Sequence, residues 1–440
     1  MQKQIKMQIL KSKNYSHNIN RIKSFSIAKF FSTNFLGNSN LIMMKKLANF
    51  RNNTLNVDMK GSDLIFQTIW SDFVHVSYFE RNKINKYFQS KFDYSKYDEE
   101  SYTIFQDESI FTDYEDKAEI DDNHLSKINY ESTENEMKIS NSTQEKGDFT
   151  LITRIPQEFN LNLKTDRNIK IVNTGDSKIL ADKEISIEFY ESNHKGDENE
   201  KIISNTNIFE AKRVRTTNFN LISGEGNKLT ASIRSYLEAE YLKFVSKNSS
   251  TIRIKKLGVV KEGLFDLKRT NLDIRSIYGP VEKKEISYRN DEIKTPSKLL
   301  TFKITGGNLN LGSIQGNVKL EFIDTEICES NLFIDSLDCE KFYLKSNTSN
   351  LNKCEVFINE VKTSCLFELN KALKSFILFV NVDKKEDFVV RYNNSIIYGD
   401  PENGNKSVIE VKSETKPEIL QVSSWDYMKR RIERKITNKQ

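Results

Sequence analysis

Short runs in which apolar and polar residues alternate fill the chain from residue 149 to residue 422. Examples are residues 159–163, 185–189 and 252–254, and Asn, Ser, Gly, Asp or Lys separate the runs. Alternation of this kind places apolar side chains on one face of an extended segment, so each run predicts a half-buried β-strand. Stripes with helical spacing are almost absent from this region. The pattern therefore predicts an all-β fold.

The runs recur at a regular distance in the third quarter of the chain. Steps of 10 and 14 residues alternate to give a repeat near 24 residues, and the run centres fall near Leu309, Lys319, Phe333, Tyr343, Phe357 and Phe367. Two sets of positions are then predicted to be equivalent: Leu309, Phe333 and Phe357; Val318, Phe342 and Leu366. Leu320 and Leu344 also match, although Glu368 takes the third place in that set. Two short strands per unit are typical of a β-solenoid, in which each coil pairs with the next.

Two other folds have strands or repeats of similar spacing. Leucine-rich repeats share the unit length, but the chain lacks their Leu-x-x-Leu-x-Leu-x-x-Asn frame and their helical half. A β-sandwich built from hairpins remains the alternative to stacked coils. We favour the solenoid because the repeat keeps its register over three units.

Residues 307–320 read Gly-Asn-Leu-Asn-Leu-Gly-Ser-Ile-Gln-Gly-Asn-Val-Lys-Leu. This segment resembles the G-x-I-x-L-x-x-I-x-G-x-V-x-L unit of the adhesin-like β-repeat family, which is found in many bacterial proteins. Residues 155–165 and 424–429 are similar to the start of the repeats and to the Trp-containing end of a eukaryotic member that carries a mitochondrial-type leader. The resemblance implies a β-solenoid with no established activity.

The chain before the repeats divides by composition. Residues 58–92 include two runs rich in aromatic and β-branched residues, which predict N-terminal strands. Residues 93–148 are acidic and then polar, which predicts a solvated, partly disordered insertion. A calcium loop would need a central glycine among its acidic residues, and none lies between Asp98 and Glu145.

Residues 1–57 contain ten basic residues and no acidic residue. A cationic, Ser- and Asn-rich start with scattered apolar residues is typical of a mitochondrial transit peptide, and we expect a mitochondrial protein in the matrix or at the inner membrane. A disordered basic arm or a nucleic-acid-binding tail is the alternative. Because the whole chain has a net charge of +5, the remainder has a net charge of −5, and no nucleic-acid partner is expected.

Motifs that carry chemistry do not emerge from the sequence. Residues 223–230 combine glycine and lysine without the spacing of a phosphate-binding loop, and are predicted to form a turn between strands. His75 alternates with apolar neighbours and is predicted to be a core or strand-surface residue. The four cysteines lack a CxxC pair and are predicted to be buried fillers: Cys328, Cys339, Cys354 and Cys365. We therefore assign no catalytic, cofactor-binding or metal-binding residue.

Residues 423–440 read as a short basic helix followed by a tail. Trp425, Met428 and Ile432 lie on one side of that helix. We expect the helix to cover the open end of the solenoid, where unpaired backbone groups would otherwise invite strand addition. Contact with anionic lipid or with RNA is a compatible second role.

These observations predict a non-enzymatic scaffold or accessory component of a larger mitochondrial assembly, with protein partners. No transmembrane segment is predicted, because the longest apolar run covers only residues 376–380. One alternative is a β-helix carbohydrate-active enzyme, whose paired carboxylates would come from Asp324, Glu326, Asp335 and Asp338. Another is an adhesin or binding module at a cell surface.

Overall fold

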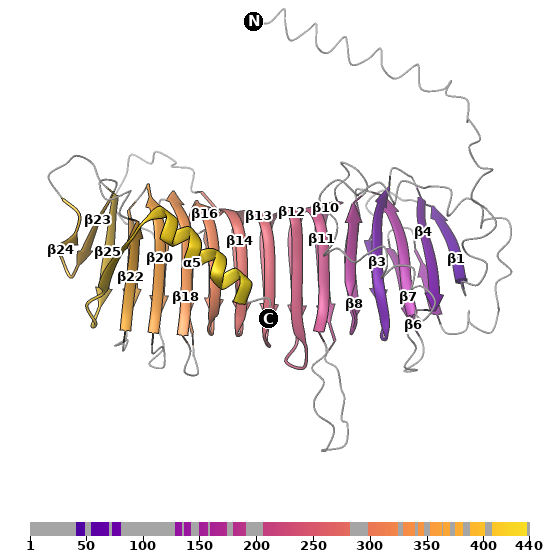
Figure 1. Ribbon diagram of the computed structural model, residues 1–440. Helices are drawn as coiled ribbons and strands as arrows, with labels where there is room; N and C mark the ends of the chain where they lie inside the picture. The colour runs from indigo at the N-terminus through magenta and orange to yellow at the C-terminus, as the bar shows by residue number, and fades with distance from the viewer. Residues whose placement is uncertain are drawn as a thin grey trace, which may run out of the picture.

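The computed structural model describes residues 41–48, 54–69, 73–80, 128–133, 136–141, 149–156, 159–173, 179–190, 206–281, 298–323, 329–338, 342–346, 353–362, 364–369, 375–381, 388–400 and 407–437. Within these ranges the chain forms 26 β-strands and one α-helix, α5 (Ser424–Thr437). The strands make one long, largely parallel sheet, which confirms the predicted all-β class and is consistent with solenoid-like stacking. Figure 1 shows the strands side by side in an elongated row.

The strands differ in length along the row. The first ten are β1 (Leu41–Ala48), β2 (Thr54–Asp58), β3 (Ser62–Ile69), β4 (Phe73–Glu80), β5 (Ile128–Ser132), β6 (Glu136–Asn141), β7 (Phe149–Pro156), β8 (Asn160–Thr165), β9 (Ile169–Asn173) and β10 (Ile179–Phe189). The next three are long: β11 (Thr206–Ser223), β12 (Lys228–Ser246) and β13 (Ser250–Leu267). Residues 224–227, within the stretch predicted to be a turn, connect β11 to β12.

Shorter strands complete the row: β14 (Thr270–Tyr278), β15 (Leu300–Ile304), β16 (Gly307–Gln315), β17 (Val318–Phe322), β18 (Glu329–Asp338), β19 (Phe342–Ser346), β20 (Lys353–Val361), β21 (Cys365–Leu369), β22 (Ser375–Asn381), β23 (Phe388–Tyr392), β24 (Ser395–Tyr398), β25 (Ser407–Ser413) and β26 (Glu418–Val422). From β14 to β21, each coil supplies one strand of nine or ten residues and one of five.

Strand pairing defines two ladders that run the length of the molecule. Ladder A has the order β1, β4, β7, β3, β9, β11, β12, β13, β14, β16, β18, β20, β22 and β26. Ladder B has the order β5, β6, β2, β8, β10, β11, β12, β13, β15, β17, β19, β21, β25, β23 and β24. The long strands β11, β12 and β13 belong to both ladders.

One hydrophobic core lies between the ladders. Leu309 and Leu311 of ladder A and Val318 and Leu320 of ladder B are all fully or almost fully buried in it. Register partners of the same kind stack along the core: the rings of Phe244, Phe265 and Phe302 have centroid separations of 5.2 and 4.7 Å. Each coil therefore buries its apolar face only by stacking on its neighbours.

The ladder pairings of β14, β16, β18 and β20 skip one residue in each strand. The skipped residues are Arg275, Gly312, Asp335 and Asn359, and they form a column at which the chain bends. A Cβ atom at position 312 would lie 1.8 Å from the backbone oxygen of Arg275, so only glycine fits there. Gly307 begins β16 with a φ of 125°, a conformation that also favours glycine.

The register departs by one residue from a uniform repeat of 24. Leu309 pairs with Leu332, a step of 23, whereas Phe333 pairs with Phe357, a step of 24. Asn310 is therefore the partner of Phe333. Since a shift of one residue moves a side chain to the other face of a strand, Leu309 belongs to the core and Phe333 to a separate outer cluster. The predicted equivalence of Leu309 with Phe333 is wrong.

On ladder B the predicted equivalences hold for one step and then fail. Val318 pairs with Phe342 and Leu320 with Leu344, as the repeat of 24 predicts. In the next coil, however, Leu344 pairs with Phe367, a step of 23, so the predicted positions of Leu366 and Glu368 are wrong by one. The shorter step keeps the inward position apolar, because Phe367 is fully buried.

The last coil departs from sequential winding. Strand β25 pairs with both β21 and β23, and β23 pairs antiparallel with β24. The order in the sheet is therefore β21, β25, β23, β24, although β25 follows β23 and β24 in the chain. On ladder A, β26 pairs directly with β22. The β23–β24 hairpin therefore forms the edge of ladder B.

The first strands begin within the segment predicted to be a leader. β1 occupies Leu41–Ala48, and Leu55 and Val57 of β2 are buried between β6 and β8. Residues 1–40 lie outside the described residues. The end of the predicted acidic insertion also joins the stack, because β6 pairs with β2; residues 81–127 lie outside the described residues. Composition missed the four strands β1, β2, β5 and β6 because short alternating runs such as Leu55-Asn56-Val57 are masked by basic or acidic neighbours.

Candidate functional site

A polar groove with a volume of about 390 Å³ lies at the N-terminal end of ladder B. We call it the N-terminal groove. Strands β2, β5, β6 and β8 supply its lining, which includes Asn56, Asp58, Glu131, Glu136, Lys138 and Lys164. These side chains point outward because the alternate positions Leu55, Val57, Ile139 and Leu163 face the core.

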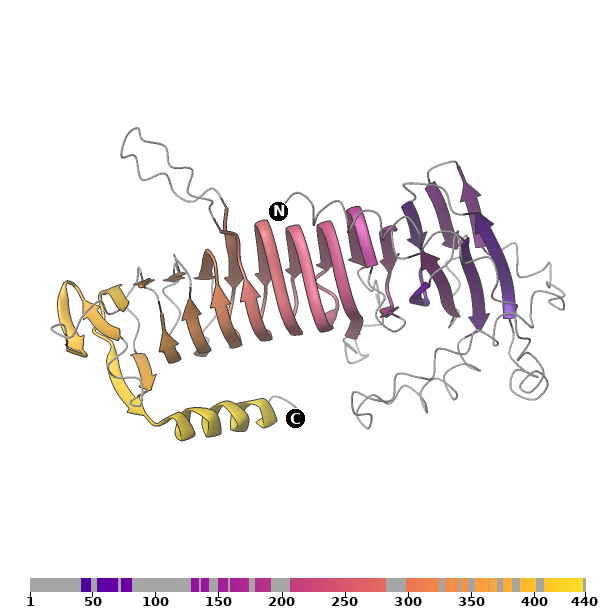
Figure 2. The ribbon, with the colours of Figure 1, turned by 90° about the horizontal axis from the view of Figure 1, so that it is seen from above.

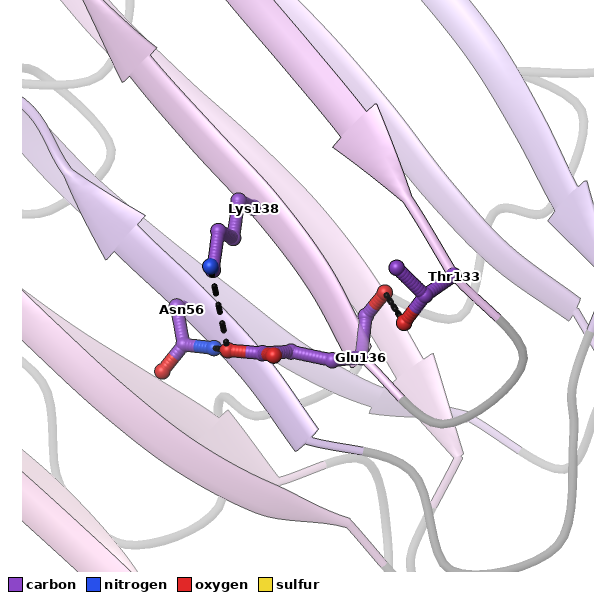
Figure 3. Close-up of polar contacts among 4 residues, drawn as sticks. All are labelled: Asn56, Thr133, Glu136 and Lys138. Atoms are coloured by element: carbon purple, nitrogen blue, oxygen red, sulfur yellow. Dashed lines mark hydrogen bonds and ion pairs between the residues drawn. The ribbon is translucent and has the colours of Figure 1, made fainter.

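Glu136 is held by groups from two strands (Figure 3). Its carboxylate accepts a hydrogen bond from the Asn56 amide, and Lys138 Nζ lies 3.8 Å from Glu136 Oε1. The turn before it is closed by Thr133, whose backbone N–H and Oγ1 donate to the backbone oxygen of Glu136 at 2.9 and 3.3 Å. The carboxylate is therefore positioned by β2 and β6 together.

The other side of the groove is similarly paired. Tyr190 Oη donates to Asp58 Oδ1 at 2.6 Å, and burial, together with the adjacent Asp58 carboxylate, raises the pKa of the Tyr190 phenol. Lys164 Nζ lies 2.8 Å from Glu188 Oε2, and this hydrogen bond raises the pKa of Lys164. Asp58, Lys164 and Glu188 thus have partners within the protein. The groove can present amides and paired charges to a polar surface.

A second feature is a row of alternating charges on the outer face of ladder B. We call it the charged column; its members are Asp266, Lys303, Glu321, Lys345, Glu368 and Lys412, each the register partner of the next. Partners on adjacent strands lie about 5 Å apart, so each charge between the two ends of the column has opposite charges as neighbours on both sides. Lys319 adds an ion pair along the strand, with Nζ 3.1 Å from Glu321 Oε2.

A third feature lies on the outer face of ladder A. Phe333, Phe357 and Phe379 are stacked register partners, with ring centroids separated by 4.3 and 3.9 Å, and we call them the aromatic column. Tyr427 of α5 packs its ring edge against Phe333 at 6.2 Å. All four rings are buried, although they lie outside the main core. In Figure 2 the helix runs beside the C-terminal strands.

The structure describes only two of the four carboxylates proposed for carbohydrate chemistry, Asp335 and Asp338. Asp335 lies in the column at the bend, where Oδ1 accepts a hydrogen bond from Tyr427 Oη at 3.0 Å. Asp338 ends β18 and is exposed. Asp324 and Glu326 lie outside the described residues. Asp335 thus anchors the helix, a role that sequence reasoning missed because Tyr427 is 92 residues away in the chain.

The cysteines and His75 lie in strands or outside the described residues. Cys354 and Cys365 are buried free thiols, as predicted, and burial raises the pKa of Cys354 to about 12. His75 lies on β4 between Lys46 of β1 and Arg154 of β7. Cys328, Cys339 and the remaining histidines fall outside the described residues. Within the described ranges, no group of His, Cys, Asp and Glu side chains is arranged to hold a metal ion.

The helix α5 contains Trp425, Met428 and Ile432 on one exposed side, as the sequence predicts. It contacts β20 and β26 of ladder A. Over the part of the chain that the structure describes, no helix combines the length and the apolar character needed to cross a bilayer.

Comparisons of the chain with protein-family models and with curated proteins find no match. The resemblance to the adhesin-like β-repeat family therefore stays a prediction. Function has to be argued from the surfaces described above.

Proposed function

We propose that this protein is a mitochondrial, non-enzymatic β-solenoid that serves as a scaffold within a larger assembly. The outer face of ladder B is the docking surface for a protein partner. The charged column is the observation that carries the proposal, because it extends a regular pattern of charge over six successive strands.

Three properties support docking on this face. The stack is continuous, so its side chains are held at fixed spacing by backbone pairing on both sides. The described helix packs on ladder A; on ladder B, Asp266 and Lys412 are exposed, the three members Lys303, Lys345 and Glu368 are partly exposed, and Glu321 is buried. Finally, alternating signs favour one register of a complementary partner over a shifted one, because a shift would oppose like charges.

Crosslinking with a lysine-reactive reagent in intact mitochondria tests the docking surface. We expect crosslinks from Lys303, Lys319, Lys345 and Lys412 to converge on one partner or a small set of partners. The K303Q/K345Q variant should lose that partner, while K261Q, which removes an exposed lysine paired with Glu240 elsewhere on β13, should retain it. Crosslinks spread evenly over exposed lysines, without a recurrent partner, would argue against a scaffold.

The mitochondrial location has its own test. Fractionation combined with terminal-peptide mass spectrometry of the endogenous protein should find it in mitochondria, with an N-terminus before Leu41, where β1 begins. An intact Met1 chain in the cytosol or at the cell surface would remove the mitochondrial part of the proposal and favour a surface adhesin or binding module.

A further inference from the structure

The orientation of α5 on the stack is fixed by several contacts on one of its sides. Tyr427 is 1% exposed, and its hydroxyl donates to the backbone oxygen of Ile334 and to Asp335 Oδ1, both at 3.0 Å. The Arg430 guanidinium lies 5.1 Å from the centroid of the Phe379 ring, over its face. The helix therefore cannot roll about its axis without breaking buried contacts.

The start of the helix is fixed as well. The backbone N–H of Asp426 donates to Ser423 Oγ at 3.1 Å, which is an N-terminal cap. Asn381, which is fully buried, donates from Nδ2 to Asn359 Oδ1 and to Ser424 Oγ at 2.6 and 2.8 Å. The first turn is thus tied to the end of the column at the bend.

The opposite side of α5 presents apolar side chains to solvent. Trp425 is 77% exposed, Met428 45% and Ile432 51%. Positions i, i+3 and i+7 share one face of a helix, so the three form a single stripe directed away from Tyr427. An exposed tryptophan beside two other large apolar residues marks an interaction surface more often than an isolated apolar residue does.

The charge around the stripe is positive, in contrast to the body of the protein. The helix carries five basic and two acidic residues: Lys429, Arg430, Arg431, Arg434 and Lys435 against Asp426 and Glu433. Residues 58–423 contain 51 basic and 60 acidic residues, a net charge of −9. An anionic surface would therefore be attracted at α5 and repelled by the body, which selects this face for contact.

We propose that α5 docks the protein on the surface of an anionic lipid bilayer. The helix lies in the plane of the interface, with Trp425, Met428 and Ile432 among the headgroups and upper acyl chains and with basic side chains beside phosphates. The stripe is narrow and convex, a shape that a deformable lipid surface accommodates without a preformed pocket. This docking uses ladder A and α5, and does not depend on the partner proposed for ladder B.

Trp425 itself reports on the contact, because the chain has only two tryptophans, Trp70 and Trp425. In the full chain carrying W70F, phosphatidylglycerol-rich vesicles should shift the Trp425 emission to the blue, and bilayer-located bromine should quench it. Phosphatidylcholine vesicles alone should produce a much smaller shift. Raising the salt concentration should weaken the response, because screening reduces attraction between exposed charges.

Flotation with vesicles supplies a second readout, with matched variants. W425S/M428S/I432S should lower partitioning onto anionic vesicles roughly tenfold or more, and K429Q/K435Q should do so by a similar factor. V260S, which removes an apolar side chain that is 52% exposed on β13, should leave partitioning unchanged. Because residues 1–57 are also cationic, the comparison is made between variants that all retain them.

The proposal is overturned if anionic vesicles leave the Trp425 emission unchanged, or if the triple variant floats as well as the parent chain. Equal responses to neutral and anionic vesicles would remove the charge argument. Loss of a protein partner in the triple variant, without any vesicle response in the parent, would show that the stripe binds protein instead. None of these outcomes alters the crosslinking expected at ladder B.

Discussion

The outer faces of the two ladders differ in what their outward residues contact. On ladder A the aromatic column of Phe333, Phe357 and Phe379 is buried beneath Tyr427 of α5. On ladder B the same coils carry Lys345, Glu368 and Lys412 of the charged column, and these remain at least partly exposed. On these coils the buried outward positions of the aromatic column are apolar, whereas the at least partly exposed outward positions of Lys345, Glu368 and Lys412 are charged.

A difference in burial also separates two lysines nearer the N-terminus that are only six positions apart. Lys164 on ladder B lies 2.8 Å from Glu188, and its pKa is raised by this hydrogen bond. Lys170 on ladder A lies 3.3 Å from Glu210, yet burial lowers the pKa of Lys170 to about 8. Similar ion pairs thus have opposite effects because one lysine is more deeply buried than the other.

The largest expected effect comes from breaking the aromatic column. F357A removes a fully buried ring stacked on both sides, and should destabilise the C-terminal coils by about 3–5 kcal/mol. E368A, on the other ladder, should cost about 1 kcal/mol or less. Hydrogen exchange of β18, β20 and β22 would measure the effect of F357A, and that of β19, β21 and β25 would measure the effect of E368A. Equal losses of protection would contradict the distinction between covered and uncovered faces.

A second prediction concerns pH and the two lysines. Because the pKa of Lys170 is lowered from 10.5 to about 8 in the folded state, the unfolded chain binds more protons between these values, and stability should rise with pH through that window. The gain is on the order of 3 kcal/mol, and K170M should abolish it.

Lys164 provides the matched control with the opposite sign. Its pKa is raised, so its contribution to stability is present below 10.5 and is lost as pH rises through the folded-state value. The unfolding midpoint of each variant is subtracted from that of the parent at each pH from 7 to 11. Because the tyrosines titrate in both proteins, their contribution cancels in this difference. A K170M variant that kept the rise in stability would show that another group causes it.

The smallest expected effect is at the charged column. K345E places three carboxylates in successive strands at positions 321, 345 and 368, and should destabilise the chain by about 1 kcal/mol or less at low salt. High salt should reduce the difference, and K345Q should show a smaller one. A salt-independent loss in thermal unfolding would indicate a packing defect rather than repulsion between charges.

The candidate surfaces were only partly predictable from the sequence. The helix and its stripe of Trp425, Met428 and Ile432 follow from helical spacing, and the structure confirms both. The helix was expected to cover the end of the stack, however, and its buried contacts lie on the outer face of ladder A. The charged column could have been found by aligning coils at the correct steps, but its members are separated by unequal numbers of residues, from 18 between Lys303 and Glu321 to 44 between Glu368 and Lys412, which hides it in the sequence.

Alternation of apolar and polar residues determined by itself that the chain forms strands, that those from β16 to β20 stack at steps near 24 residues, and that residues 424–437 form a basic amphipathic helix. Tertiary structure decided the rest: the steps of 23, the insertion of β25 between β21 and β23, and the burial of Tyr427 on Phe333. The physical reason is that alternation has a period of two residues. It fixes which residues share a face, whereas only packing against neighbouring coils decides which face is buried and which strand lies beside it.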